Sequence, residues 1–122
     1  MTKPTILIIE DDPALLELYS AMVGNGGYQA LAAPDAQTAL DCMKKFTPAL
    51  IIEDLSLPDL SGLQLLHCIR QLPNAEEIPV IILSGSPGRI ELARHSREQF
   101  VAFLHKPVTQ QDLLASVRKY IH

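Results

Sequence analysis

Acidic, hydroxyl and ammonium side chains stand directly after the short aliphatic runs of this sequence. Glu10 and Asp11 follow the first run, Asp54 follows the third, Ser84 closes the fourth, and Lys106 comes just after the fifth. Grouped carboxylate oxygens suit Mg²⁺, a hard cation that keeps several waters and binds through one or two carboxylates plus a phosphate. An ammonium and a hydroxyl suit the oxygens of an anion. Brought together, these residue types predict phosphoryl transfer.

Asp54 is the side chain of this set that could accept the phosphoryl group. A carboxylate is already ionised at neutral pH, so it can act as the nucleophile without a separate base. Two unit charges about 4 Å apart repel by roughly 4 kcal/mol near a protein surface, so three neighbouring carboxylates would be strained without a cation. Mg²⁺ would remove that repulsion, and with Lys106 and Ser84 it would surround the phosphoryl oxygens.

The elements that must position these residues alternate between two hydrophobic periods. Short runs, several of them apolar on both faces, predict five parallel strands, at 5–10, 28–32, 49–53, 80–84 and 100–104. Longer stretches with apolar residues every three or four positions predict helices that begin near residues 12, 35, 62, 88 and 109. Strict alternation predicts an α/β fold, a doubly wound parallel sheet with helices on both faces. Ligands bind outside the carboxyl ends of the strands in such sheets.

Helix starts and buried faces can also be predicted. Asp12 before a proline predicts the N-cap of the first helix, and Thr109 with Asp112 has capping-box spacing in the last. The fourth helix is the least regular because polar residues 94–97 occupy its middle. The apolar spacing of the first helix predicts its inward face, which is Leu15, Leu18, Tyr19 and Met22.

Composition limits the class of protein. The 122 residues are the size of one domain, so 1–122 is assigned to one unit, and 48% apolar residues supply a core. The net charge is -4 and the 10 bases are scattered, which argues against nucleic-acid binding. The first apolar run is too short for a secretion signal or a membrane span, so a cytoplasmic protein is expected. Cys42 and Cys68 stand apart and are expected to be free thiols that are buried or half-buried.

Four segments together resemble the motifs of response-regulator receiver domains. Residues 50–62 (LIIEDLSLPDLSG) resemble the phosphoacceptor segment, with Pro58 four places and Gly62 eight places after Asp54. Three further segments resemble the family's other motifs, in the same order and at ordinary distances. They are 8–13 (IIEDDP), 79–85 (PVIILSG) and 103–107 (FLHKP). The resemblance covers essentially the whole chain. It implies a flavodoxin-like strand order, 2-1-3-4-5, and a signalling switch that is not an enzyme but catalyses its own phosphorylation and dephosphorylation.

The resemblance implies a role for each residue at the acidic end of the site. Asp54 is expected to be phosphorylated in the presence of Mg²⁺. Glu10 and Asp11 form the acidic pair, and Asp11 is expected to be the direct metal ligand. Asp54 itself and the backbone carbonyl of Ser56 complete the expected ligands of the cation.

The resemblance also implies a switch. Lys106 is expected to bind the phosphoryl group and to join Pro107 through a cis peptide bond. Ser84 would be the switch hydroxyl and Phe103 the switch aromatic, so that phosphorylation draws the hydroxyl inward and the ring follows. The face built from the fourth helix, the fifth strand and the fifth helix would then change its partners.

Two small residues are predicted to set the lifetime of the phosphoryl group. Ser56 and Ser86 lie two places beyond Asp54 and Ser84, at positions that flank the path of water in this family. Their small size would leave that path open, so larger side chains there would change the rate of autodephosphorylation.

The expected partners follow from the same resemblance. A histidine kinase or a histidine phosphotransfer protein would donate the phosphoryl group. A downstream protein, or an output domain outside this sequence, would receive the signal. Phosphorylation-dependent homodimerisation is left open, whereas direct binding to nucleic acid or to a membrane is not expected.

Three other functions compete with the switch. A Mg-dependent aspartyl-phosphate phosphatase of the haloacid-dehalogenase type would need a second Asp where Ser56 stands. A flavin carrier would need a Ser/Thr/Gly-rich loop after the first strand, where this sequence has acids. A pseudo-receiver that docks without phosphorylation is disfavoured because every reactive group is present. Glu53, Asp12 and Asp59 are interpreted as solvated or capping acids, and the histidines at 67, 95, 105 and 122 lack metal-ligand spacing.

Overall fold

A parallel sheet forms the centre of the protein in a computed structural model, which describes residues 3–55, 62–86, 88, 91, 94 and 100–121. Its strands are β1 (Thr5–Ile9), β2 (Gln29–Ala33), β3 (Leu50–Asp54), β4 (Val80–Ser84) and β5 (Ala102–His105). They lie in the order β2-β1-β3-β4-β5, and all neighbouring pairs are parallel. The expected fold class and strand order are therefore confirmed.

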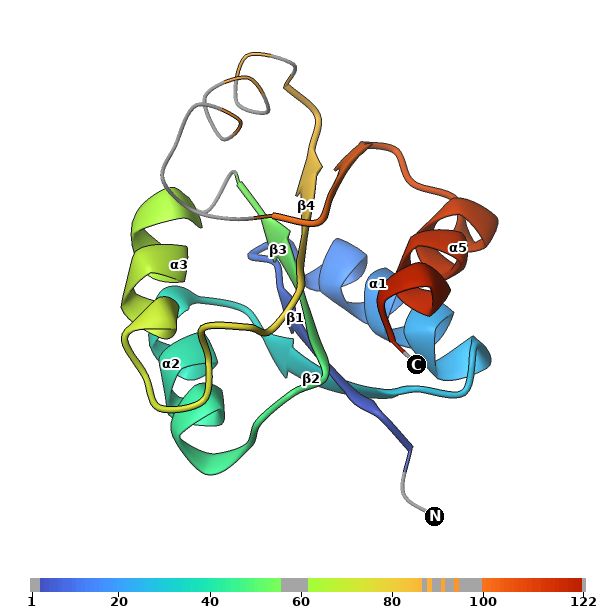
Figure 1. Cartoon of the computed structure of the whole chain (residues 1–122). Coiled ribbons are helices and arrows are strands. Elements are labelled where there is room, and N and C mark those ends of the chain that lie inside the picture. Colours follow the sequence, from blue (N-terminus) through green and yellow to red (C-terminus); the bar gives the residue numbers. More distant parts are fainter. Residues whose placement is uncertain are drawn as a thin grey trace.

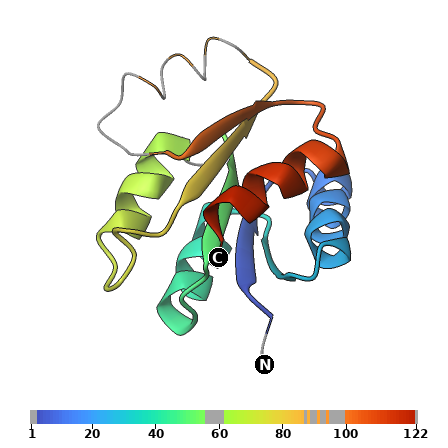
Figure 2. The same cartoon turned by 45° about the vertical axis from the view of Figure 1, so that its right-hand side comes forward.

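Helices cover both faces of the sheet (Figure 1). α1 (Pro13–Asn25) and α5 (Gln110–Tyr120) pack on one face, and α2 (Ala36–Lys45) and α3 (Gly62–Arg70) pack on the other. In Figure 2, α5 lies against α1. The two helices are also joined by a hydrogen bond from the Asn25 side-chain amide to Gln110 Oε1, 2.9 Å long.

Strand side chains alternate between two aliphatic layers. Leu7 and Ile9 of β1 lie in the layer with α2 and α3, while Ile6 and Ile8 lie in the layer with α1 and α5. Strands β3 and β4 are buried along their whole length. Because close-packed interiors yield little to local forces, the carboxyl ends of these strands are held in fixed positions.

The helix caps lie next to the carboxyl edge of the sheet. Asp12 Oδ1 accepts a hydrogen bond from the Ala14 backbone N–H at 2.9 Å, and Thr109 Oγ1 accepts one from the Asp112 N–H at 3.1 Å. Both capping predictions are confirmed. Each cap satisfies a donor that the first helical turn leaves unpaired.

Four sequence-based expectations are wrong. Cys68 is exposed, whereas Cys42 is half-buried as expected. Leu18 is 46% exposed, because the inner face of α1 follows Tyr19, Met22 and Val23, positions three and four apart. Glu53 is fully buried rather than solvated or capping, because β3 is a central strand covered on both faces. The fifth strand begins at Ala102 instead of residue 100.

Part of the predicted fourth helix falls on residues outside the described set. Gly88, Glu91 and Arg94 are helical, but the bounds of that helix, together with Ser56, Asp59, His95 and His122, lie outside the residues that the structure describes. Within the described ranges, no helix is long and apolar enough to cross a membrane.

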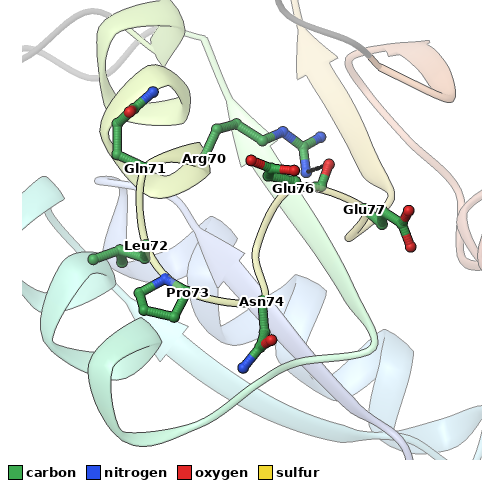
Figure 3. Close-up of a pocket in the computed structure, with 7 residues that line it drawn as sticks. All are labelled: Arg70, Gln71, Leu72, Pro73, Asn74, Glu76 and Glu77. Atoms are coloured by element: carbon green, nitrogen blue, oxygen red, sulfur yellow. Dashed lines mark hydrogen bonds between the residues drawn. The ribbon is translucent and has the colours of Figure 1, made fainter.

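The connection between α3 and β4 surrounds an open pocket at the amino edge of the sheet (Figure 3), lined by residues 70–74, 76 and 77. Arg70 Nη1 donates to the backbone carbonyls of Ala75, Glu76 and Ile78 at 2.8, 3.0 and 2.7 Å. These bonds tie the loop to the end of α3. The pocket therefore has a structural guanidinium in its wall and lies at the sheet edge opposite Asp54.

Candidate functional site

Four polar side chains meet at the carboxyl edge of the sheet. Asp54 and Ser84 are the last residues of β3 and β4, Glu10 directly follows β1, and Lys106 directly follows β5. The strands β1, β3, β4 and β5 are neighbours in the sheet, so residues far apart in sequence are brought together. Glu10, Asp54 and Ser84 are almost completely buried, at 1%, 2% and 1% exposure.

The Lys106 ammonium bridges two carboxylates. Its Nζ lies 2.9 Å from Glu10 Oε1 and 2.9 Å from Asp54 Oδ2. The side chain of Lys106 is 18% exposed, so its charge is only partly screened by water. The Lys106–Pro107 peptide bond is cis, as expected.

Burial sets the protonation of the site. Desolvation raises the pKa of Glu10 from 4.5 to about 8, and the neighbouring Asp54 adds to this effect, while Lys106 offsets part of it. Burial alone would lower the pKa of Lys106, but its hydrogen bonds and charge interactions with both carboxylates raise it overall. Burial and the neighbouring Asp54 therefore favour the protonated form of Glu10, and the two carboxylates favour the charged form of Lys106.

Asp11 completes an acidic cluster that opens to solvent. Carboxylate oxygens of Glu10, Asp11 and Asp54 all lie within 4.8 Å of one another. Asp11 is exposed, and its backbone N–H donates to Glu10 Oε2 at 3.1 Å. An all-oxygen set with one open side fits a hydrated divalent cation, since Mg²⁺ retains several waters.

The Ser84 hydroxyl is bonded to the turn that follows β4. Its Oγ accepts a hydrogen bond from the Ser86 N–H at 3.0 Å and donates to the Ser86 carbonyl at 3.3 Å. The hydroxyl is thus held at the sheet edge by backbone, in an arrangement that must break before it can bond to a group on Asp54.

Phe103 lies on β5, on the sheet face that α2 and α3 cover. It is half-buried, and the ring of Phe100 packs edge-on against it, with centroids 5.4 Å apart. The guanidinium carbon of Arg94 lies 5.0 Å from the centroid of the Phe103 ring. The expected switch aromatic is therefore held between the core and the connection from β4 to β5.

A family comparison agrees with this geometry. Residues 6–118 match the family model of the response regulator receiver domain. The chain belongs to this family. It is a receiver domain of two-component signalling, and its acidic cluster lies where the sequence motifs placed it.

Relatives of the receiver domain include proteins of very different length. This chain is 32% identical over 119 residues to the sensor histidine kinase TmoS of Ectopseudomonas mendocina. The match covers 98% of this chain but 12% of that protein. The chain is 25% identical over 121 residues to the polar-differentiation response regulator DivK of Brucella ovis, with 99% and 98% covered. A solved sensor protein from Polaromonas sp. JS666 has a TM-score of 0.88 at 28% identity, with 98% and 96% covered.

The receiver domain brings together most of the residues proposed from sequence. Glu10, Asp11 and Asp54 form one cluster, Lys106 bonds to Glu10 and Asp54, and Ser84 lies at the same edge. Ser86 is described and half-buried. Ser56, which was expected to contribute a carbonyl ligand and to influence dephosphorylation, lies outside the described residues. The roles of these residues stay predictions.

Sequence reasoning missed an apolar pocket beside the site of this receiver domain. It has a volume of about 300 Å³ and is lined by Leu15, Leu18, Tyr19, Lys106, Pro107 and Val108. The exposed side chain of Leu18 forms part of its rim. The signal was present in the helical spacing of Leu15 and Leu18, but that spacing was interpreted as core.

Proposed function

We propose that this receiver domain is a phosphorylation-dependent switch in which Asp54 accepts a phosphoryl group in the presence of Mg²⁺. The observation that supports this most strongly is the Lys106 bridge to Glu10 and Asp54 at 2.9 Å, beside the open side chain of Asp11. An ammonium already bonded to the acceptor carboxylate is poised to follow that oxygen when it becomes part of an acyl phosphate.

The chemistry is a transfer from a phosphohistidine or a small acyl phosphate. An Asp54 carboxylate oxygen attacks phosphorus, the new O–P bond forms as the P–N or P–O bond to the donor breaks, and the imidazole leaving group takes up a proton. Lys106 then donates to a phosphoryl oxygen through a charge-assisted hydrogen bond. The chain promotes its own phosphorylation and dephosphorylation and turns over no separate substrate.

The acidic cluster is the proposed binding site for Mg²⁺. Glu10, Asp11 and Asp54 would hold the ion, with Asp11 as a direct ligand and the carbonyl of Ser56 as a further one. When bound, the cation neutralises charge that develops on the phosphoryl oxygens. Because burial favours the protonated form of Glu10, a proton must leave if Glu10 is to act as a charged ligand.

Acetyl phosphate tests the proposal without a protein partner. Incubation with acetyl phosphate and Mg²⁺ is expected to add one phosphoryl group, detected by intact-mass spectrometry, and EDTA or Asp54→Asn is expected to abolish the addition. A pseudo-receiver would give no Mg-dependent addition. A phosphatase would instead release phosphate from phosphomonoesters over many turnovers.

Ser86 is proposed to influence the lifetime of the acyl phosphate together with Ser56. The Ser86 backbone holds the Ser84 hydroxyl, and its own side chain lies next to that turn. Autodephosphorylation of Ser86→Lys and Ser56→Arg is expected to change in rate, and unchanged rates in both variants would overturn this part of the proposal.

The protein donor is proposed to dock beside the site on α1. A histidine kinase or phosphotransfer protein must place its phosphohistidine within bonding distance of Asp54, so it must cover the surrounding edge. The 46% exposed Leu18 and the apolar pocket next to Lys106 are suited to that contact. The output partner, a separate protein or an attached domain, is proposed to contact the face built from β5, α5 and the β4–β5 connection. A phosphorylation-dependent homodimer is proposed to use the same face.

A further inference from the structure

Arg94 joins the connection between β4 and β5 to the sheet. Its guanidinium carbon lies 5.0 Å from the centroid of the Phe103 ring, while the Phe100 ring contacts Phe103 at an interplanar angle of 64°. A guanidinium within about 6 Å of a ring centroid is attracted by the negative face of the ring. Arg94 is exposed and Phe103 is half-buried, so the cation contacts the ring from its solvent side.

The same connection is attached to the sheet at its other end through Ser84. Both hydrogen bonds of the Ser84 hydroxyl go to the backbone of Ser86, at the beginning of the connection. Phe103 pairs in register with Ile82, two residues before Ser84 on the neighbouring strand. Among the described residues of the connection, Ser86 is thus bonded to the sheet edge through Ser84, and Arg94 contacts the sheet through Phe103.

We propose that Arg94 is a latch for the resting state, which holds Phe103 in its observed orientation and opposes the change that phosphorylation drives. The latch rests on the proposed function, because the opposing force is the pull of a phosphoryl group on Asp54. When Ser84 turns toward that group, its bonds to Ser86 break and the connection shifts on the sheet. A contact made in only one of two states biases the equilibrium toward that state by its full differential energy.

The affinity for a phosphoryl mimic measures this bias. The dissociation constant of beryllofluoride with Mg²⁺ is measured by titration calorimetry on the full chain. Arg94→Ala is expected to tighten beryllofluoride binding about two- to fivefold. The reason is that the substitution removes an exposed cation–π contact that is present in the resting state only. Arg94→Lys is expected to give a smaller effect, because an ammonium keeps the charge but not the planar stacking. Arg118→Ala, which removes an exposed arginine of α5, is the matched control and is expected to leave the affinity unchanged.

A double-mutant cycle separates the ring contact from a general charge effect. In a Phe103→Leu background, Arg94→Ala is expected to leave the affinity unchanged, because the partner ring is already absent. Equal tightening in both backgrounds would overturn the latch. So would unchanged or weaker binding of beryllofluoride by Arg94→Ala in the presence of Phe103.

A measurement without any ligand keeps the latch separate from the proposed function. Asp54→Asn is expected to bind no beryllofluoride. If the wild-type protein also binds none, the proposed function is overturned. Carbon relaxation dispersion on the Phe103 ring then decides the latch. Arg94→Ala is expected to raise the population of the minor ring orientation about two- to fivefold, and an unchanged population would overturn the latch.

Discussion

Glu10 couples the stability of the metal-free protein to pH. The pKa of Glu10 is about 8 in the folded state, against an ordinary value of 4.5. Between these two pH values the folded state therefore keeps a proton that the unfolded chain has lost. The stabilisation is present in full below about pH 4.5 and is lost as pH rises toward 8. Urea unfolding in EDTA is expected to show a free energy of unfolding that falls by up to about 1.4 kcal/mol per pH unit. In Glu10→Gln this slope is expected to disappear, and a slope equal to that of wild type would contradict the assignment.

Lys106 is expected to contribute more to phosphorylation than any surface lysine. Lys106→Met removes the donor that lies 2.9 Å from Asp54 Oδ2. The rate of phosphorylation by acetyl phosphate is expected to fall about 100-fold, the effect typical of losing one charge-stabilising donor. The exposed Lys44 of α2 offers a control, since Lys44→Met is expected to leave the rate unchanged. Equal phosphorylation rates for the two variants would show that Lys106 stabilises the unphosphorylated site but does not assist the transfer.

At the scale of elements, the start of α3 requires a glycine. A Cβ on Gly62 would lie 2.8 Å from Leu55 Cδ2, 3.0 Å from Glu53 Oε1 and 3.2 Å from Leu55 Cα. Gly62→Ala is therefore expected to lower the free energy of unfolding by about 1–3 kcal/mol, the usual cost of overpacking.

Gly24 in α1 is the matched control for this substitution. A Cβ there meets nothing within 4 Å, so Gly24→Ala is expected to raise stability by up to about 1 kcal/mol through helix propensity. Chemical denaturation of both variants measures the contrast, and destabilisation by Gly24→Ala would show that the space around α1 has been misjudged.

Helix α1 carries the proposed contact with the phosphoryl donor. Leu18→Glu is expected to lower the rate of transfer from a phosphorylated histidine kinase or phosphotransfer protein by about tenfold or more, as for a central interface residue. Phosphorylation by acetyl phosphate and thermal stability are expected to stay as in wild type, because Leu18 is 46% exposed. A parallel fall in both phosphorylation rates would place the defect in the site instead.

At the scale of the whole molecule, ligand binding at the sheet edge is expected to stabilise the entire fold. Glu10 and Asp54 belong to the ends of the central strands β1 and β3, and Lys106 follows the edge strand β5. Only the folded sheet brings the three together, so a ligand that binds them binds the folded state only. With Mg²⁺ and beryllofluoride at about 100 times the dissociation constant, the gain is about 2.7 kcal/mol. The melting temperature is expected to rise by several degrees, and the rise is expected to vanish in Asp54→Asn. An equal rise in that variant would mean that the ligands bind elsewhere.

The failed expectations share a physical cause. Leu18 was assigned to the core because apolar spacing in α1 identifies a face without showing how far the partner elements extend over it. Glu53 was assigned to solvent because a charged residue type is rarely buried, whereas its place on a central strand decided otherwise. Burial is a property of the assembled layers, so local pattern indicates it only on average.

The sequence alone determined the alternation of strands and helices, the caps at Asp12 and Thr109, and the edge of the sheet at which the acidic cluster lies. These depend on periodicity and on neighbouring residues, which are local properties of the chain. Tertiary structure decided which oxygens Lys106 bridges, the raised pKa of Glu10, and the contact of Arg94 with Phe103. Each of these depends on distances of a few ångströms between segments far apart in sequence, and only the packed sheet and its covering helices set those distances.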